Sequence, residues 1–201
     1  MTSLTQPLSV DAIVIGTSAG GVEALSVVLP ALPAAYQGAV FVVLHLPRER
    51  PSLLVDLFAP RCKLPVREAD DKEPVANGTI YFAPPDYHMM IDRGPQLALS
   101  VDEPVNFSRP SIDVLFESAA EVYGSRLLGV ILTGASQDGA SGLEAVHRAG
   151  GVTCVQDPST AQAPLMAEAA IRRTHVDHVL PLEPLAGLLR TVTADRGADK
   201  A

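Results

Sequence analysis

The chain has 201 residues, of which 47% are hydrophobic and 19% are charged, so it can fill a compact core and is too apolar to be disordered. Fifteen basic and 23 acidic residues give a net charge of −8, which argues against nucleic acid or an anionic membrane as the main partner. Two distant cysteines, apolar runs too short to span a membrane and a start unlike a signal peptide favour a cytoplasmic protein without membrane insertion.

Short apolar runs alternate with helical segments along the chain. A single domain is expected at 11–192, between flexible tails at 1–10 and 193–201. The expected strands are 11–16, 39–46, 79–83, 88–92, 96–101, 126–132, 152–156 and 179–180. The expected helices are 20–32, 51–59, 111–123, 142–149, 165–172 and 185–191. This alternation predicts an α/β fold: a three-layer α/β/α, doubly wound, mostly parallel sheet with an antiparallel hairpin at one edge.

The first expected strand ends in a glycine-rich turn that leads directly into a helix. Gly16, Ser18 and Gly20 have the spacing of a nucleophile elbow, in which the glycines permit a tight turn that projects the serine hydroxyl above the sheet. The same turn could instead bind a phosphate or only reverse the chain. It lacks the third glycine of a dinucleotide-binding motif and the lysine of a P-loop, so a nucleotide site is the weaker alternative.

Two further strands end in residues that could activate a serine. His45 follows the second strand and could act as the base, while Asp138 follows the strand at 126–132 and could orient the imidazole ring. Each residue also has a structural alternative: a hydrogen-bonded core histidine, and a cap on the next helix. Because the carboxyl ends of parallel strands meet at one edge, a single crevice could collect all three side chains. The chain order Ser, His, Asp differs from that of the α/β-hydrolases.

Other polar residues give weaker signals. Arg109 could hold an acidic substrate, whereas Ser108 or Ser111 beside it could cap the following helix. His88 could line the crevice, although a structural role is the more economical interpretation. The histidines have no third ligand at metal-binding spacing, so neither a metal site nor a cofactor is expected.

With these motifs in place, the chain resembles the catalytic domain of the chemotaxis protein-glutamate methylesterases, the CheB family. The resemblance spans about residues 11–190, in family order, and rests on the stretches IVIGTSAGGVEAL, VVLHLPRE, VREADDKEPVANGTIYFAPPDYHMMI, RPSIDVLFESAAEVYG and LLGVILTGASQDGASGLEAVHRAGGVTCVQDPSTA. It implies a catalytic triad of Ser18, His45 and Asp138, with backbone N–H groups at Ala19 and Ala135 for the oxyanion. It also implies hydrolysis of glutamate methyl esters on the cytoplasmic helices of chemoreceptors, and deamidation of certain glutamines.

The sequence departs from the family pattern at a few positions. Ala19 stands where the family often has threonine, and Ala135 and Ser136 replace a Met-Gly pair in the loop before Asp138. Only about ten residues precede the first strand, so we expect no receiver domain. Control would then come from a separate regulatory protein, come from the level of expression, or be absent. These departures keep open a second hypothesis, a non-catalytic signalling or binding module of the same fold. Because the net charge repels acidic receptor helices, Arg48, Arg50 and Arg109 are candidates for a local basic patch.

Overall fold

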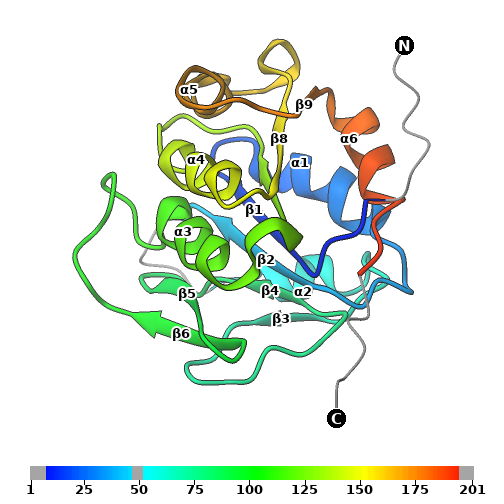
Figure 1. Cartoon of the computed structure of the whole chain (residues 1–201), viewed down its shortest axis with the longest axis vertical. Coiled ribbons are helices and arrows are strands. Elements are labelled where there is room, and N and C mark those ends of the chain that lie inside the picture. The colour runs from blue at the N-terminus through cyan, green and yellow to red at the C-terminus, as the bar shows by residue number, and fades with distance from the viewer. Residues whose placement is uncertain (1–7, 47–51, 195–201) are drawn as a thin grey trace.

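Seven parallel strands form the central sheet of the computed structural model, which describes residues 8–46 and 52–194. The strand order is β3-β4-β2-β1-β7-β8-β9, so β1 lies in the middle between β2 and β7 (Figure 1). Their bounds are β1 Ala12–Thr17, β2 Ala39–Leu44, β3 Val66–Glu68, β4 Ile80–Phe82, β7 Leu127–Ile131, β8 Val152–Gln156 and β9 His178–Leu180. All residues of β1, β2 and β7 are buried, as expected for strands covered on both faces.

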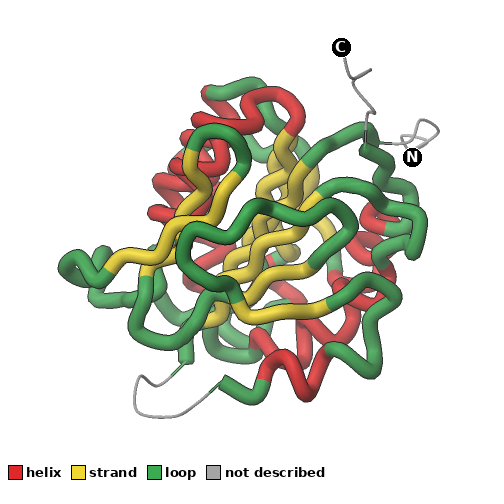
Figure 2. Tube along the Cα trace, turned by 90° about the horizontal axis from the view of Figure 1, so that it is seen from below, coloured by secondary structure: helices red, strands yellow, loops and turns green. Residues whose placement is uncertain are grey.

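Helices cover both faces of this sheet, so that the strands form a layer between them (Figure 2). Side chains of α1, α2 and α6 pack into one core cluster, and those of α3, α4 and α5 into the other. The helix bounds are α1 Gly21–Val28, α2 Leu54–Phe58, α3 Ile112–Tyr123, α4 Ala140–Arg148, α5 Leu165–Arg173 and α6 Leu182–Leu189. The predicted three-layer α/β/α fold is therefore confirmed.

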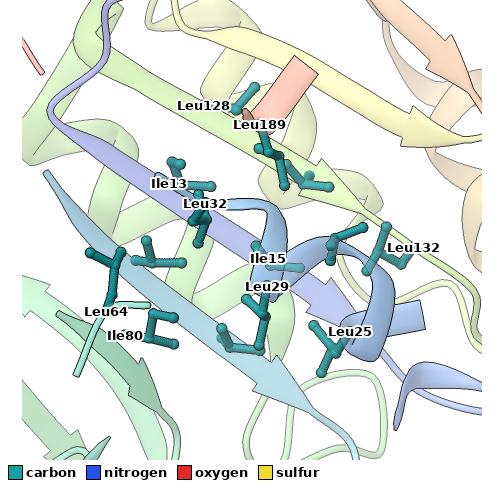
Figure 3. Packing of buried hydrophobic residues seen from close by; sticks show 14 of the residues in the cluster. Ile13, Ile15, Leu25, Leu29, Leu32, Leu64, Ile80, Leu128, Leu132 and Leu189 are labelled. Atoms are coloured by element: carbon teal, nitrogen blue, oxygen red, sulfur yellow. The ribbon is translucent and has the colours of Figure 1, made fainter. Parts of the chain in front are cut away.

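Alternate residues along each central strand fill opposite cores. Ile13 and Ile15 of β1 pack with Leu25 and Leu29 on one face (Figure 3). Val14 of the same strand packs on the other face. Because burying one such side chain contributes about 1.5–3 kcal/mol, the two cores together hold the strands in a single register.

The hairpin differs from its expected place. Strands β5, His88–Asp92, and β6, Gln96–Ser100, pair antiparallel as predicted, but they form a separate two-stranded sheet instead of an edge of the main one. Met89, Ile91 and Leu97 of this hairpin are buried in the core that α3 helps to form. The hairpin therefore packs against a helix and does not extend the parallel ladder.

The ends of several helices and strands also differ by a few residues from the predicted ones. The helix expected at 20–32 is α1 followed by a short 3-10 turn at Leu29–Ala31, where Pro30 stops the regular helix. Strand β3 was not predicted, because two of its three residues are exposed and it shows no apolar run. The described parts of the two expected tails pair with each other: Val10 N donates to Thr193 O at 2.7 Å. The rest of both tails lies outside the described residues.

Candidate active site

Ser18 and His45 lie side by side because their strands are paired in register. Thr17, the last residue of β1, is opposite Leu44, the last residue of β2, and the N–H of His45 donates to Thr17 O at 3.1 Å. Each of the two residues comes directly after its strand. On the other side of β1, the N–H of Ser18 donates to Thr133 O at 3.0 Å, which ties the serine to the end of β7. The sheet itself therefore brings three chain segments together at its carboxyl edge.

The turn that carries Ser18 depends on two glycines. Gly20 has φ 78°, a left-handed conformation that glycine adopts without strain, and it directly precedes α1. Gly16 faces α3 so closely that a Cβ atom there would lie 2.3 Å from a side-chain carbon of Ile112. The Gly-x-Ser-x-Gly spacing therefore serves both the sharp turn and the close approach of α3 to β1.

His45 and Asp138 are joined by a hydrogen bond. His45 Nε2 donates to Asp138 Oδ2 at 2.9 Å, across 93 residues of sequence. Because that nitrogen carries the proton, Nδ1 of the neutral ring is the nitrogen with a free lone pair, and it is the one that remains for a serine proton. Among the described residues, the Ser18 hydroxyl makes no hydrogen bond of its own. The arrangement matches the relative roles of base and orienting carboxylate in a serine hydrolase.

Asp138 is completely buried and is held by the N-terminus of α3. Its carboxylate accepts hydrogen bonds from Ile112 N at 2.6 Å, Ser111 Oγ at 2.8 Å and Asp113 N at 3.2 Å. Burial by itself raises the pKa of Asp138, but its hydrogen bonds, the one from His45 foremost, outweigh burial and hold the pKa below its ordinary value. Asp138 therefore stays ionised beside the imidazole ring.

The capping alternatives are wrong for both Asp138 and Ser111. Asp138 precedes α4, yet its side chain binds the start of α3, and no side chain at the N-cap position of α4 makes a capping bond. Ser111 occupies the N-cap position of α3, yet its hydroxyl donates to Asp138. Instead, Asp113 of α3 accepts hydrogen bonds from Gly139 N at 2.9 Å and Gly142 N at 2.7 Å at the start of α4.

Two loops that flank Ser18 carry the expected oxyanion donors. Ala19 lies in the turn before α1 and Ala135 in the loop after β7, both exposed, and neither backbone N–H donates to another described residue. Thr133, which is buried, connects these loops: its Oγ1 donates to Ala19 O at 2.9 Å and accepts from Ala163 N at 2.9 Å. The tie through Thr133 was not predicted, because a threonine at a strand end carries no distinguishing sequence signal.

Arg109 lies at the rim of the site with its charge already paired. Its guanidinium donates to Asp86 Oδ1 at 2.8 Å and to the backbone oxygens of Val101 and Asp102. These contacts hold together the segments that precede β5 and α3. Arg48 and Arg50 lie outside the described residues.

A cavity of about 230 Å³ opens beside His45, and most of its wall comes from the segment before α3. Phe107 in this wall is fully exposed, with a left-handed φ of 62°. The lining residues are His45, Leu46, Phe107, Ser108, Arg109 and Pro110.

His88 has the structural role that its sequence context favoured. Its ring is buried; Nδ1 accepts from Ser111 N at 3.2 Å, so Nε2 carries the proton that it shares with Glu103 O at 3.2 Å. It thereby supports the residue that contacts Asp138. Within the described part of the chain, no group of three His, Cys, Asp or Glu side chains could hold a metal ion.

The family described as CheB methylesterase matches residues 13–189, which is most of the chain. The chain belongs to the CheB methylesterase family. A crystal structure of the CheB methylesterase catalytic domain of Thermotoga maritima superposes with a TM-score of 0.84 at 32% identity, covering 91% of this chain and 98% of that one. The match shows that the chain has the fold of that catalytic domain.

Two relatives of this CheB domain differ in how much of their own length it matches. A provisionally named protein-glutamate methylesterase/protein-glutamine glutaminase of Leptospira interrogans is 45% identical over 90% of this chain and 94% of that protein. Protein-glutamate methylesterase/protein-glutamine glutaminase 2 of Anaeromyxobacter dehalogenans is 40% identical over 92% of this chain, but over only 54% of that protein. The chain therefore spans nearly the whole length of the first relative and about half of the second.

Proposed function

We propose that the chain is a protein-glutamate methylesterase in which Ser18, His45 and Asp138 act as nucleophile, base and orienting carboxylate. The observation that carries the proposal is the 2.9 Å hydrogen bond from His45 to the buried Asp138, at the strand end beside Ser18. The methylesterase and glutaminase names of its relatives support the same reaction class.

The reaction follows from the roles of these groups. His45 Nδ1 takes the hydroxyl proton of Ser18 as the oxygen attacks the γ-carbonyl of a glutamate methyl ester. The backbone N–H groups of Ala19 and Ala135 would receive the oxyanion, and His45 then returns the proton to the departing methanol. Water, deprotonated by His45, cleaves the acyl-serine to give glutamate and regenerate the hydroxyl. Glutamine deamidation would use the same steps with ammonia as the leaving group.

The proposed substrates are methylated glutamates on the cytoplasmic helices of chemoreceptors, which would place the reaction in the cytoplasm. No helix in the described residues is long and apolar enough to cross a membrane. A helix presents its side chains outward, so a methylated glutamate can reach a shallow site whose rim contacts the helix surface. A separate regulatory protein remains a proposed second partner. The cavity beside His45, with Phe107 on its rim, suits a rim contact of this kind.

Replacing Phe107 by alanine is expected to raise the KM for methylated receptor about fivefold or more, if Phe107 is an anchor of the receptor contact, because truncating such an anchor costs over about 1 kcal/mol. Steady-state kinetics on receptor substrate measure this change. Val179→Ala, an exposed apolar residue on edge strand β9, serves as the matched control and should leave KM within about twofold. An unchanged KM in Phe107→Ala would mean that Phe107 takes no part in the proposed receptor contact.

Methanol release from methylated receptor tests the proposed activity directly. The chain should release methanol catalytically, and a chain that binds receptor without release would instead be the non-catalytic module. A fluorophosphonate probe separates the two, because covalent labelling that requires both Ser18 and His45 reports an activated serine. No comparison with known proteins favours the non-catalytic alternative.

A further inference from the structure

Two buried carboxylates, Asp138 and Asp113, lie between the N-termini of two helices and bind them crosswise. Asp138, in the loop before α4, accepts the backbone N–H of Ile112 at the start of α3. Asp113, in the first turn of α3, accepts the backbone N–H of Gly142 in α4. Asp138 therefore provides an acceptor for an N–H group in the first turn of α3, and Asp113 provides one for α4. These N–H groups have no partner within their own helices.

The two negative charges oppose each other across this junction. Burial is the main reason that the pKa of Asp113 is raised above its ordinary value, and the charge of Asp138 adds to the increase. A group that donates a hydrogen bond to both carboxylates would reduce this repulsion. It would also fix the angle of the Asp138 carboxylate, on which the orientation of His45 depends.

Asn106 is placed to be that group. Its amide nitrogen Nδ2 donates to Asp113 Oδ2 at 2.7 Å and to Asp138 Oδ1 at 3.0 Å, one bond for each of its two hydrogens. Asn106 also has φ 50°, a left-handed conformation that asparagine tolerates better than most residues. Local backbone strain of this kind persists where the surrounding structure over-determines it, and it clusters at functional sites.

We propose that Asn106 is a positioning residue of the active site, which holds the Asp138 carboxylate against His45 by sharing its amide between Asp138 and Asp113. The inference rests on the proposed function, since it assigns Asn106 to the same serine chemistry. Asn106 touches neither substrate nor the reacting serine in this assignment and acts only through Asp138.

Asn106→Gly is the sharpest variant, because glycine keeps the left-handed turn and removes only the amide. We expect the rate of fluorophosphonate labelling at Ser18 and the kcat for methanol release to fall about tenfold, with KM changed less than about twofold. Without the amide donor, more negative charge stays on Asp138 and stabilises protonated His45. The acid limb of both rate profiles should therefore move to higher pH, a change that a merely structural residue would not produce.

Lys72→Gly is the matched control, because Lys72 is another non-glycine residue with positive φ, 63°, and is exposed in the loop between β3 and β4. It should label at the wild-type rate. Asn106→Asp is the second variant, which keeps size and turn preference and removes the donor, so it should lose at least as much rate as Asn106→Gly. Its use keeps the test decisive if the glycine variant unfolds.

A wild-type labelling rate and acid limb in either Asn106 variant would overturn the inference. Failure of the proposed function is a separate result: wild-type chain that is labelled at Ser18 but releases no methanol from receptor. The labelling assay still tests Asn106 in that case, because it needs a reactive serine and no receptor.

Discussion

Replacing Ser18 by alanine is expected to lower methanol release from methylated receptor by about 10⁴- to 10⁶-fold, because the proposed acyl intermediate forms on the Ser18 hydroxyl. The backbone turn should survive, since Ser18 makes its fold contact through its N–H to Thr133 O and alanine retains that group. A coupled methanol assay on purified receptor, run beside thermal unfolding, measures both properties.

Ser26→Ala is the matched control for this substitution. Ser26 lies on α1, the helix that follows Ser18, and its hydroxyl donates to Val22 O at 2.8 Å within the helix. It should therefore keep its rate within about twofold of wild type. Equal rates for Ser18→Ala and wild type would refute the serine mechanism, while equal losses in both serine variants would point to damage to α1.

Asp138→Asn is expected to lower kcat by about 10³- to 10⁴-fold and to destabilise the fold. An amide at this position can donate to His45 Nε2, which would leave the proton on Nδ1 and remove the base facing Ser18. The same amide nitrogen cannot accept from Ile112 N, so a buried donor loses its partner at a cost of about 1–3 kcal/mol. Steady-state kinetics and urea unfolding at pH 7 measure the two effects.

The stability difference between wild type and Asp138→Asn should depend on pH. The folded pKa of Asp138 is lowered below its unfolded value of about 3.9, so ionised Asp138 stabilises the fold above that pH. This contribution is lost as the pH falls through the folded pKa. The difference in unfolding free energy should therefore shrink below about pH 4. A difference that does not shrink below that pH would contradict the lowered pKa.

Ser111→Ala is a useful comparison for Asp138→Asn. It removes one donor to Asp138 Oδ1 but leaves the carboxylate and its bond to His45 in place. Its kcat should fall by a smaller factor, about tenfold. A loss as large as that of Asp138→Asn would mean that the hydroxyl, and not the charge, governs the orientation of His45.

Sequence alone predicted the layers and most elements because each central strand is a continuous apolar run. Residues 152–156 and 88–92 have the predicted strand bounds, and α3 begins one residue later than expected. The failures share a cause. Strand β3 depends on pairing with β4 and has no apolar run of its own, and the place of the β5–β6 hairpin depends on its packing with α3, so contacts outside the element itself decide both.

Ser18 and His45 directly follow β1 and β2, and Asp138 lies in the loop after β7, but the partners of Asp138 were not foreseeable. Glycines and a serine at fixed spacing predicted the turn at Ser18, because that turn is a local backbone requirement. The contacts of Asn106 and Asp113 with the region of Asp138 join segments about 25 to 32 residues apart. No periodicity or spacing in the sequence records such a contact.

The composition by itself determined that the chain is acidic and has enough apolar residues for a compact core. The motifs after the expected strands predicted the candidate site residues, because each motif is a short stretch of neighbouring residues. Only the tertiary structure decided that Asp138 binds α3 instead of capping α4, and that Arg109 is paired with Asp86. The physical reason is that a buried charge needs hydrogen-bond donors beside it, and the fold brings these donors from distant parts of the chain.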